Sequence, residues 1–180
     1  MATAKKAAAK KAVAKKAPAK KAAAKKAARA RPDATALLIK DHKDVKALFK
    51  RYQKLMKAEA DGSERQELAT RICQMLTVHA TIEEEIFYPA VREADVDEDM
   101  LDEAEVEHAS AKDLIAQIRS MGPDDDLYDA KVTVLGEYID HHVQEEEGEM
   151  FPKARRAKVD MEGLMNRLQE RKTALMGEMQ

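Results

Sequence analysis

Apolar residues recur every three or four positions along most of the chain after residue 33, which is the spacing of one face of an α-helix. The pattern predicts five helices, at about residues 33–60, 63–92, 95–122, 124–152 and 160–177. Asp33 is the expected N-cap of the first helix, and Ser63 with Gln66 is expected to form a capping box at the second. Because the connections between the long helices are short, neighbouring helices should run antiparallel.

The predicted fold is therefore all-α: an antiparallel up-down-up-down four-helix bundle over residues 33–155, with a shorter C-terminal helix within residues 156–180. The composition agrees, because Gly (6) and Pro (5) are scarce and residues that form helices well, above all Ala, Leu, Glu and Lys, dominate. The last helix carries a stripe of leucines, which suits either capping of the bundle or contact with a partner.

Polar residues interrupt these apolar stripes at equivalent places. Each of the four long helices carries one histidine inside its stripe: His42, His79, His108 and His142. In the second and fourth helices a glutamate follows the histidine by four residues, and a proline follows the glutamate by six: Glu83 and Pro89, Glu146 and Pro152. Residues i and i+4 share one helix face, so each histidine and glutamate can hold one metal ion, or the glutamate can bridge two.

A single histidine in a helical core is usually an ordinary hydrogen-bonded residue. Four of them in register, however, together with two carboxylates, would each cost several kcal/mol if buried without partners. A pair of metal ions removes that cost, because neutral imidazoles and carboxylates become ligands. The repeat of one histidine followed by His-x-x-x-Glu therefore favours a metal site over six unrelated core residues.

This pattern, over about residues 35–152, resembles the haemerythrin/HHE cation-binding family, most specifically in the segments from His79 to Pro89 and from His142 to Pro152. The resemblance implies two non-haem irons joined by an oxo or hydroxo bridge, with chemistry or sensing of O2, NO, peroxide or iron. It implies that four histidines are terminal ligands and that two glutamates bridge the irons: His42, His79, His108 and His142, with Glu83 and Glu146.

The third helix departs from the oxygen-carrying haemerythrins, which place two histidines four residues apart there. Ala104 and Lys112 occupy the positions four residues before and after His108. One iron should therefore lack an imidazole and be open to water, or take a carboxylate such as Glu105. This disfavours reversible O2 carriage and leaves room for redox or peroxide reactivity, and a mononuclear or zinc-filled site is also conceivable.

Several neighbours of this constellation have expected roles outside it. His141 lies about 100° from His142 on a helix, so it should leave the stripe, where Glu145 is its partner four residues on. Glu84 and Glu147 are expected to be solvated or to contact ligands rather than to be ligands themselves. Two tyrosines in the stripes are expected to pack in the core rather than to line the site: Tyr52 and Tyr138.

The net charge of −2 conceals two oppositely charged parts. Residues 1–32 contain ten Lys and two Arg and no acid, whereas the remainder has 20 basic and 34 acidic residues, a net −14. A segment with so little to bury should be disordered alone and resembles the lysine/alanine tails of linker-histone-like proteins. The lysines recur in pairs every five residues: Lys5, Lys6, Lys10, Lys11, Lys15, Lys16, Lys20, Lys21, Lys25 and Lys26.

This tail predicts non-specific DNA or RNA binding driven by counterion release. A tail that folds back on the acidic body, or one that touches anionic lipid, is the alternative. The leading hypothesis for the whole chain is a di-iron protein that binds or senses O2, NO, peroxide or iron and is tethered to nucleic acid. The alternatives are a nucleoid-associated DNA-binding protein with a structural metal, and a di-iron enzyme that consumes peroxide.

Cysteine usage and hydropathy bound the compartment. One cysteine, Cys73, allows no disulfide within the chain, and no run of about 18 apolar residues is present. The N-terminus has no apolar segment of the kind found in secretory signals. We therefore expect a cytoplasmic protein without membrane insertion, associated with the nucleoid if the tail binds DNA.

Overall fold

The structure, a computed structural model, describes residues 33–157 and 159–178. These residues belong to the second of two units into which the chain divides, residues 31–180. The lysine-rich tail, and with it the predicted nucleic-acid contacts, lies outside the described residues.

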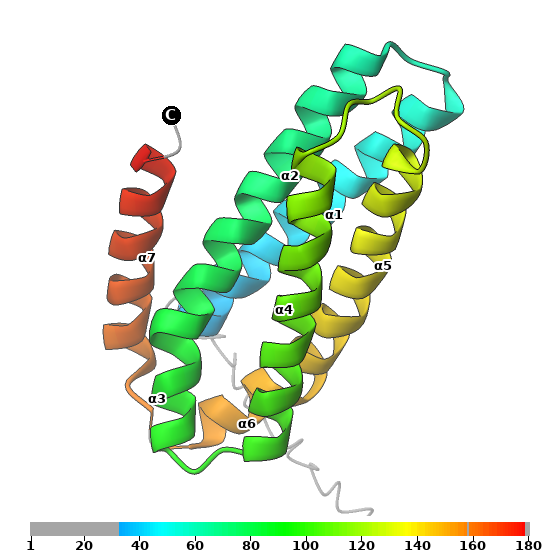
Figure 1. The fold of residues 1–180 in the computed structure, drawn as a ribbon. Coiled ribbons are helices and arrows are strands. Elements are labelled where there is room, and N and C mark those ends of the chain that lie inside the picture. The colour runs from blue at the N-terminus through cyan, green and yellow to red at the C-terminus, as the bar shows by residue number, and fades with distance from the viewer. Residues whose placement is uncertain (1–32, 158, 179–180) are drawn as a thin grey trace, which may run out of the picture. The chain divides into compact units, whose positions relative to one another are not determined.

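Four long helices form the bundle that the sequence predicts (Figure 1). They are joined by short connections and pack in the cyclic order in which they follow one another: α1 (Ala34–Lys57), α2 (Gly62–Ile82), α4 (Glu98–Arg119) and α5 (Tyr128–Glu145). The prediction of an all-α bundle is confirmed.

The second and fourth long helices are each interrupted by a turn of π-helix ahead of a proline. In the first case η1 (Glu83–Phe87) leads into α3 (Tyr88–Glu93), and in the second η2 (Glu146–Met150) leads into α6 (Phe151–Arg156). Proline has no N–H and its ring clashes with the carbonyl of an α-helical preceding turn, so the backbone widens before it. The N–H of residue 88 accordingly donates to the carbonyl of Glu83, five residues back.

The caps agree with the sequence at one helix and differ at the next. Asp33 caps α1, accepting a hydrogen bond from the backbone N–H of Ala36 at 2.9 Å. The capping box predicted at Ser63 is wrong: α2 begins one residue earlier and Asp61 is its cap. The Asp61 carboxylate accepts from the backbone N–H and the hydroxyl of Ser63, at 2.7 and 2.6 Å. Aspartate accepts these bonds as well as serine would have done, and it stands nearer the turn.

The bundle core is divided into two apolar clusters by the histidine layer. On α1, Leu38 belongs to one cluster and Val45 to the other, with buried His42 between them. On α4, Ala104 and Ala111 are divided in the same way by His108. The polar side chains therefore lie in a layer across the bundle, enclosed by apolar packing on both sides.

The C-terminal helix α7 (Met161–Glu178) completes one of these clusters. It packs beside α1, α2 and η1 (Figure 1), with its leucine stripe buried: Leu164, Leu168 and Leu175. Of the two roles that the sequence allowed for this helix, the structure shows capping of the bundle. Within the residues that the structure describes, no helix is long and apolar enough to cross a membrane.

Candidate metal centre

The structure brings all six predicted ligand side chains into one buried cluster. The two glutamates are 0% and 1% exposed, and none of the four histidines exceeds 8%. The helices place them there directly, because each histidine occupies a core position of its apolar stripe. The cluster comprises His42, His79, Glu83, His108, His142 and Glu146.

The histidines meet in pairs, one pair from each half of the chain. Nε2 of His42 lies 3.0 Å from Nε2 of His79, and Nε2 of His108 lies 3.2 Å from Nε2 of His142. Two ligand atoms that are each about 2.1 Å from an ion stand about 3.0 Å apart at a right angle and about 3.4 Å apart at the tetrahedral angle. Both separations therefore match two nitrogens that share one metal ion.

Each glutamate connects the two histidine pairs through one oxygen. Oε2 of Glu83 lies 3.2 Å from His79 Nε2 and 3.6 Å from His108 Nε2. Oε2 of Glu146 lies 3.2 Å from His42 Nε2 and 3.5 Å from His142 Nε2. The carboxylates thus stand between the pairs, which is the geometry of groups that bridge two ions.

A carboxylate also faces the outer nitrogen, Nδ1, of every one of these histidines. The separations are 3.0, 3.6, 2.9 and 2.7 Å, from His42 to Glu147, His79 to Asp41, His108 to Glu84, and His142 to Glu107. A carboxylate at Nδ1 favours the tautomer whose proton is on that nitrogen. Sequence reasoning placed Glu84 and Glu147 only as solvated or ligand-contacting groups, and it did not single out Asp41 or Glu107.

This orientation decides what the inner nitrogens can do. When each imidazole carries its single proton on Nδ1, the four Nε2 lone pairs point at one another and at carboxylate oxygens. Within the described residues both oxygens of Glu83 and Oε2 of Glu146 have no hydrogen-bond partner. Facing lone pairs and unpaired buried carboxylates are strongly unfavourable without a cation. The donor set therefore fits a pair of metal ions with nitrogen and oxygen ligands.

The electrostatics of the protein groups alone lead to the same conclusion. Burial, reinforced by the Glu146 carboxylate, raises the pKa of Glu83 well above its ordinary value. Burial lowers the pKa of His79 to about 4, so that this imidazole is neutral at pH 7 and free to donate its lone pair. A metal cation would place positive charge beside the buried carboxylates and displace protons from the cluster.

Sequence reasoning also missed Tyr88, whose hydroxyl contacts the inner atoms of this cluster. Its hydroxyl donates to Oε1 of Glu146 at 3.0 Å and lies 3.4 Å from Nε2 of His108. The equivalent position of the second repeat holds Phe151, which stacks on the His42 ring with 5.8 Å between the ring centroids. One half of the cluster thus has a phenol where the other has a hydrocarbon. The sequence could have pointed to this difference, because the first repeat ends in Tyr-Pro and the second in Phe-Pro.

A small cavity adjoins all four imidazoles. Its volume is about 20 Å³, and apolar side chains, among them Leu76, Ile139 and Val143, form most of its wall. A space of this size holds one water-sized molecule. This space lies next to the nitrogens that face the cluster.

Other predicted neighbours lie away from the cluster. His141 is 64% exposed and faces Glu145, as expected from its helical position. Glu105 contacts Arg92 at the surface at 3.0 Å, so it does not take the place of the missing imidazole. Tyr52 is buried and donates to Asp129, which agrees with core packing, whereas Tyr138 is half exposed and the prediction of a core role for it is wrong.

Comparison with known proteins assigns the family. The sequence pattern of the Hemerythrin HHE cation binding domain matches residues 33–154, and the chain belongs to this family. A relative from Nostoc sp. named "DNA nickase" is 33% identical over 115 residues, which cover 62% of this chain and 30% of the relative. The chain thus spans less than a third of that relative's length.

A solved structure shows the same fold. It is the crystal structure of a Hemerythrin HHE cation binding domain-containing protein from Mycobacterium kansasii, with a TM-score of 0.67 and 22% identity. The match covers 81% of this chain and 88% of that chain. The family assignment makes this a cation-binding domain, and the cluster of buried histidines and glutamates has side chains that could hold cations.

Proposed function

We propose that this protein holds two non-haem irons in the buried cluster and uses them to bind or sense O2, NO, peroxide or iron. The observation that carries the proposal is the sharing of Glu83 between two groups of potential ligands, one with His42 and His79 and the other with His108 and His142. A shared carboxylate supports two ions rather than one. The mixture of imidazole and carboxylate ligands suits iron, although other divalent metals also accept it.

The protein's own groups would shape the chemistry of bound irons. Bound iron supplies redox chemistry and affinity for small oxidants when it occupies the cluster. The mostly apolar cavity leaves room for a small ligand beside the imidazoles, while the outer carboxylates hold the imidazoles in the tautomer that can bind metal. The Tyr88 hydroxyl can hold or move a proton at Oε1 of Glu146.

The test is the metal content of the full-length protein from iron-replete cells, together with its optical spectrum. We expect about two irons per chain and near-ultraviolet absorption from oxo-bridged iron, both lost on removal of the metal. One iron per chain, or zinc alone after loading with iron, would contradict the di-iron proposal while leaving the cation-binding family intact.

The nucleic-acid part of the proposal rests on charge. Residues 1–32 carry twelve positive charges and no negative ones, and the relative named "DNA nickase" is 33% identical to this chain over 115 residues. A cationic segment of this kind binds polyanions mainly through released counterions, so its affinity should fall steeply with salt. The tail would then hold the iron cluster close to DNA or RNA without reading its sequence.

Replacing the ten tail lysines by glutamine in the full-length protein should weaken binding to duplex DNA by at least about 100-fold at low salt. It should also flatten the dependence of affinity on salt, because fewer counterions are released. Fluorescence anisotropy with a labelled duplex measures both. The iron content serves as control and should stay unchanged; undiminished DNA binding in this variant would place the contact in the acidic domain and refute tethering by the tail.

A second candidate function, consumption of peroxide, is favoured by the Tyr88 hydroxyl. Replacing Tyr88 by phenylalanine removes the proton that this hydroxyl donates to Glu146 and copies the Phe151 half of the cluster. We expect full iron content but at least a tenfold loss of peroxide turnover, since positioned proton donors contribute about 10²–10⁴-fold. Oxygen release from added peroxide measures the rate.

The matched control is Tyr52→Phe. It removes another buried hydroxyl, one that donates to Asp129 within the other apolar cluster. This variant should lose about 1 kcal/mol of stability and keep its turnover. Equal rates in the wild type and the Tyr88 variant would argue for sensing or binding instead of catalysis.

A further inference from the structure

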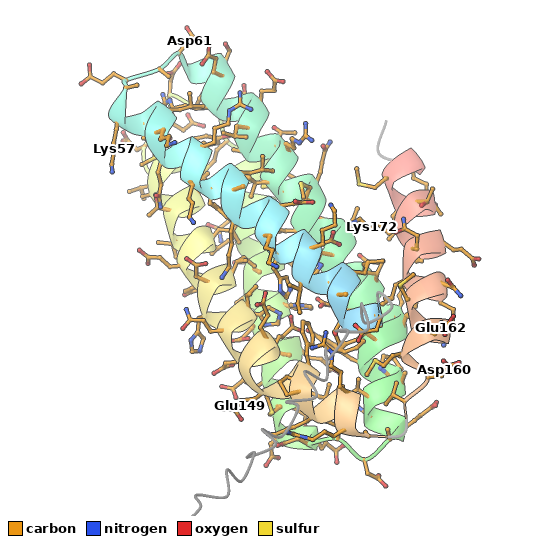
Figure 2. All side chains as sticks on the ribbon, turned by 180° about the vertical axis from the view of Figure 1, so that it is seen from behind. Lys57, Asp61, Glu149, Asp160, Glu162 and Lys172 are labelled. Carbon is orange, nitrogen blue, oxygen red and sulfur yellow. The ribbon has the colours of Figure 1, made fainter. Side chains whose placement is uncertain are left out.

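A second hollow in the structure reaches the metal cluster from outside and is strongly acidic. It has a volume of about 110 Å³, and five glutamates line it: Glu103, Glu107, Glu145, Glu146 and Glu149. No Lys or Arg side chain is among its lining residues. The exposed Glu149 stands at its outer side, where the chain passes from α5 towards α6 (Figure 2). Carboxylates gathered in this way repel one another and attract a cation.

Three side chains near this hollow form a group with the geometry of a metal site. Nε2 of His141 lies 3.5 Å from Oε1 of Glu107 and 3.4 Å from Oε1 of Glu145. Atoms about 2.1 Å from a common ion stand about 3.4 Å apart at the tetrahedral angle. The group is partly exposed, and His141 is 64% exposed, so an ion here would keep water ligands.

Glu107 belongs both to this outer group and to the buried centre. Its Oε1 faces His141, while its Oε2 accepts the Nδ1 proton of His142 at 2.7 Å. Glu146, which also lines the hollow, is 1% exposed, and its Oε2 has no hydrogen-bond partner among the described residues. The hollow therefore runs from two carboxylates of the outer group, Glu107 and Glu145, to the buried Glu146, one oxygen of which has no hydrogen-bond partner among the described residues.

We propose that Glu107, His141 and Glu145 form an outer divalent-cation site, and that Fe²⁺ bound there passes along the acidic hollow to Glu146 and His142. This inference rests on the proposed function, because it needs a buried centre that takes up iron. A mixed imidazole and carboxylate group with bound water suits Fe²⁺ and Mn²⁺ and binds them weakly enough to let them go.

Nearby positive charge does not block this site. Lys153, which contacts the lining residue Met100, is engaged by Asp97 at 2.8 Å and by Glu149 at 3.3 Å. Its pairing with Glu149 neutralises one of the lining carboxylates and leaves Glu103, Glu107 and Glu145 to attract the ion. By contrast Glu84, the carboxylate that faces His108, is paired with Lys112.

The test compares iron uptake by the full-length wild type and by a variant carrying both His141→Ala and Glu145→Gln. Metal-stripped protein is mixed anaerobically with a limiting amount of Fe²⁺, and the ion that remains accessible to a chelator is followed over time. We expect the variant to take up iron at least tenfold more slowly, yet to reach the same two irons per chain. Glu137→Gln, which makes the same charge change on α5 outside the hollow, should load at the wild-type rate.

A second measurement detects the outer site itself. Wild-type protein already loaded with iron is titrated with Mn²⁺ and should bind one further ion per chain by electron paramagnetic resonance; the double variant should bind none. If the wild type loads iron and the double variant takes it up at the same rate, the inference is overturned while the proposed function stands. If the double variant loses the extra Mn²⁺ but loads iron as fast as the wild type, the inference is also overturned, because the outer site would then lie off the route to the buried centre. No iron uptake by the wild type would instead refute the proposed function.

Discussion

Replacing Glu83 by alanine should empty both metal positions at once. This glutamate is the one residue common to both groups of potential ligands, and its Oε2 stands between His79 and His108. Its loss would leave each ion with two imidazoles and with Glu146 as the only remaining carboxylate between them. We expect the iron content to fall from about two per chain to less than about 0.2, a loss of affinity well beyond the 10–100-fold seen on removing outer-sphere partners.

Two further variants show whether that loss is specific. Glu85→Ala changes another glutamate of η1, but one that is half exposed and bound to Arg171 at 2.6 Å, so it should keep both irons. His108→Ala removes a ligand from one group only and should leave about one iron per chain. If Glu83→Ala retained two irons with an unchanged spectrum, the buried glutamate would be a core residue, and the proposed centre would be wrong.

Removing the metal should lower the melting temperature by about 10–20 °C. Among the described residues, both oxygens of Glu83 and one oxygen of Glu146 lack hydrogen-bond partners in the metal-free cluster, and each such buried carboxylate costs several kcal/mol. For a domain of this size each kcal/mol shifts the melting temperature by about 2–4 °C or somewhat more. Calorimetry or circular dichroism on protein before and after chelation measures the change.

The sign of a Glu83→Gln substitution should then depend on the metal. In the metal-free protein it removes a buried carboxylate whose pKa is raised, and it should therefore stabilise the fold. In the protein purified from iron-replete cells the substitution removes a bridging ligand, and it should destabilise the fold. Arg65→Gln, which weakens the distant contact with Asp129, should lower the melting temperature equally in both forms. A Glu83 variant that behaves alike with and without metal would contradict a role in binding it.

The sequence predicted the bundle and the convergence of the six polar residues because both follow from α-helical spacing. Leucines and histidines at intervals of three and four residues share a face in any straight α-helix, whatever packs against it. The contact of Tyr88 with the cluster was not predicted because the helix is not a regular α-helix at that point. On an α-helix Tyr88 would lie about 140° from Glu83, on another face. The π-turn of η1 makes these two residues hydrogen-bonded neighbours and brings the phenol to the cluster.

The contacts of the outer carboxylates with the histidines were not predicted for a different reason. Asp41 and Glu107 each immediately precede a predicted ligand, and in a chain with 37% charged residues an acid beside a histidine carries little information. Their role depends on which neighbouring helix each one faces. Asp41 lies opposite His79 on α2, and Lys172 of α7 binds it from outside (Figure 2). Such contacts depend on the packing of helices, which spacing along one helix does not determine.

The bundle consists of two hairpins, residues 34–93 and 98–156, and each contributes a glutamate that contacts a histidine of the other. Glu84 of the first orients His108 of the second, and Glu147 of the second orients His42 of the first. Two copies of a single hairpin could satisfy this exchange as a symmetric homodimer, so such a peptide is a candidate ancestor and a minimal design. Symmetry, however, would give both ions the same aromatic neighbour. Fusion into one chain is what allows Tyr88 and Phe151 to differ, and with them the two halves of the cluster.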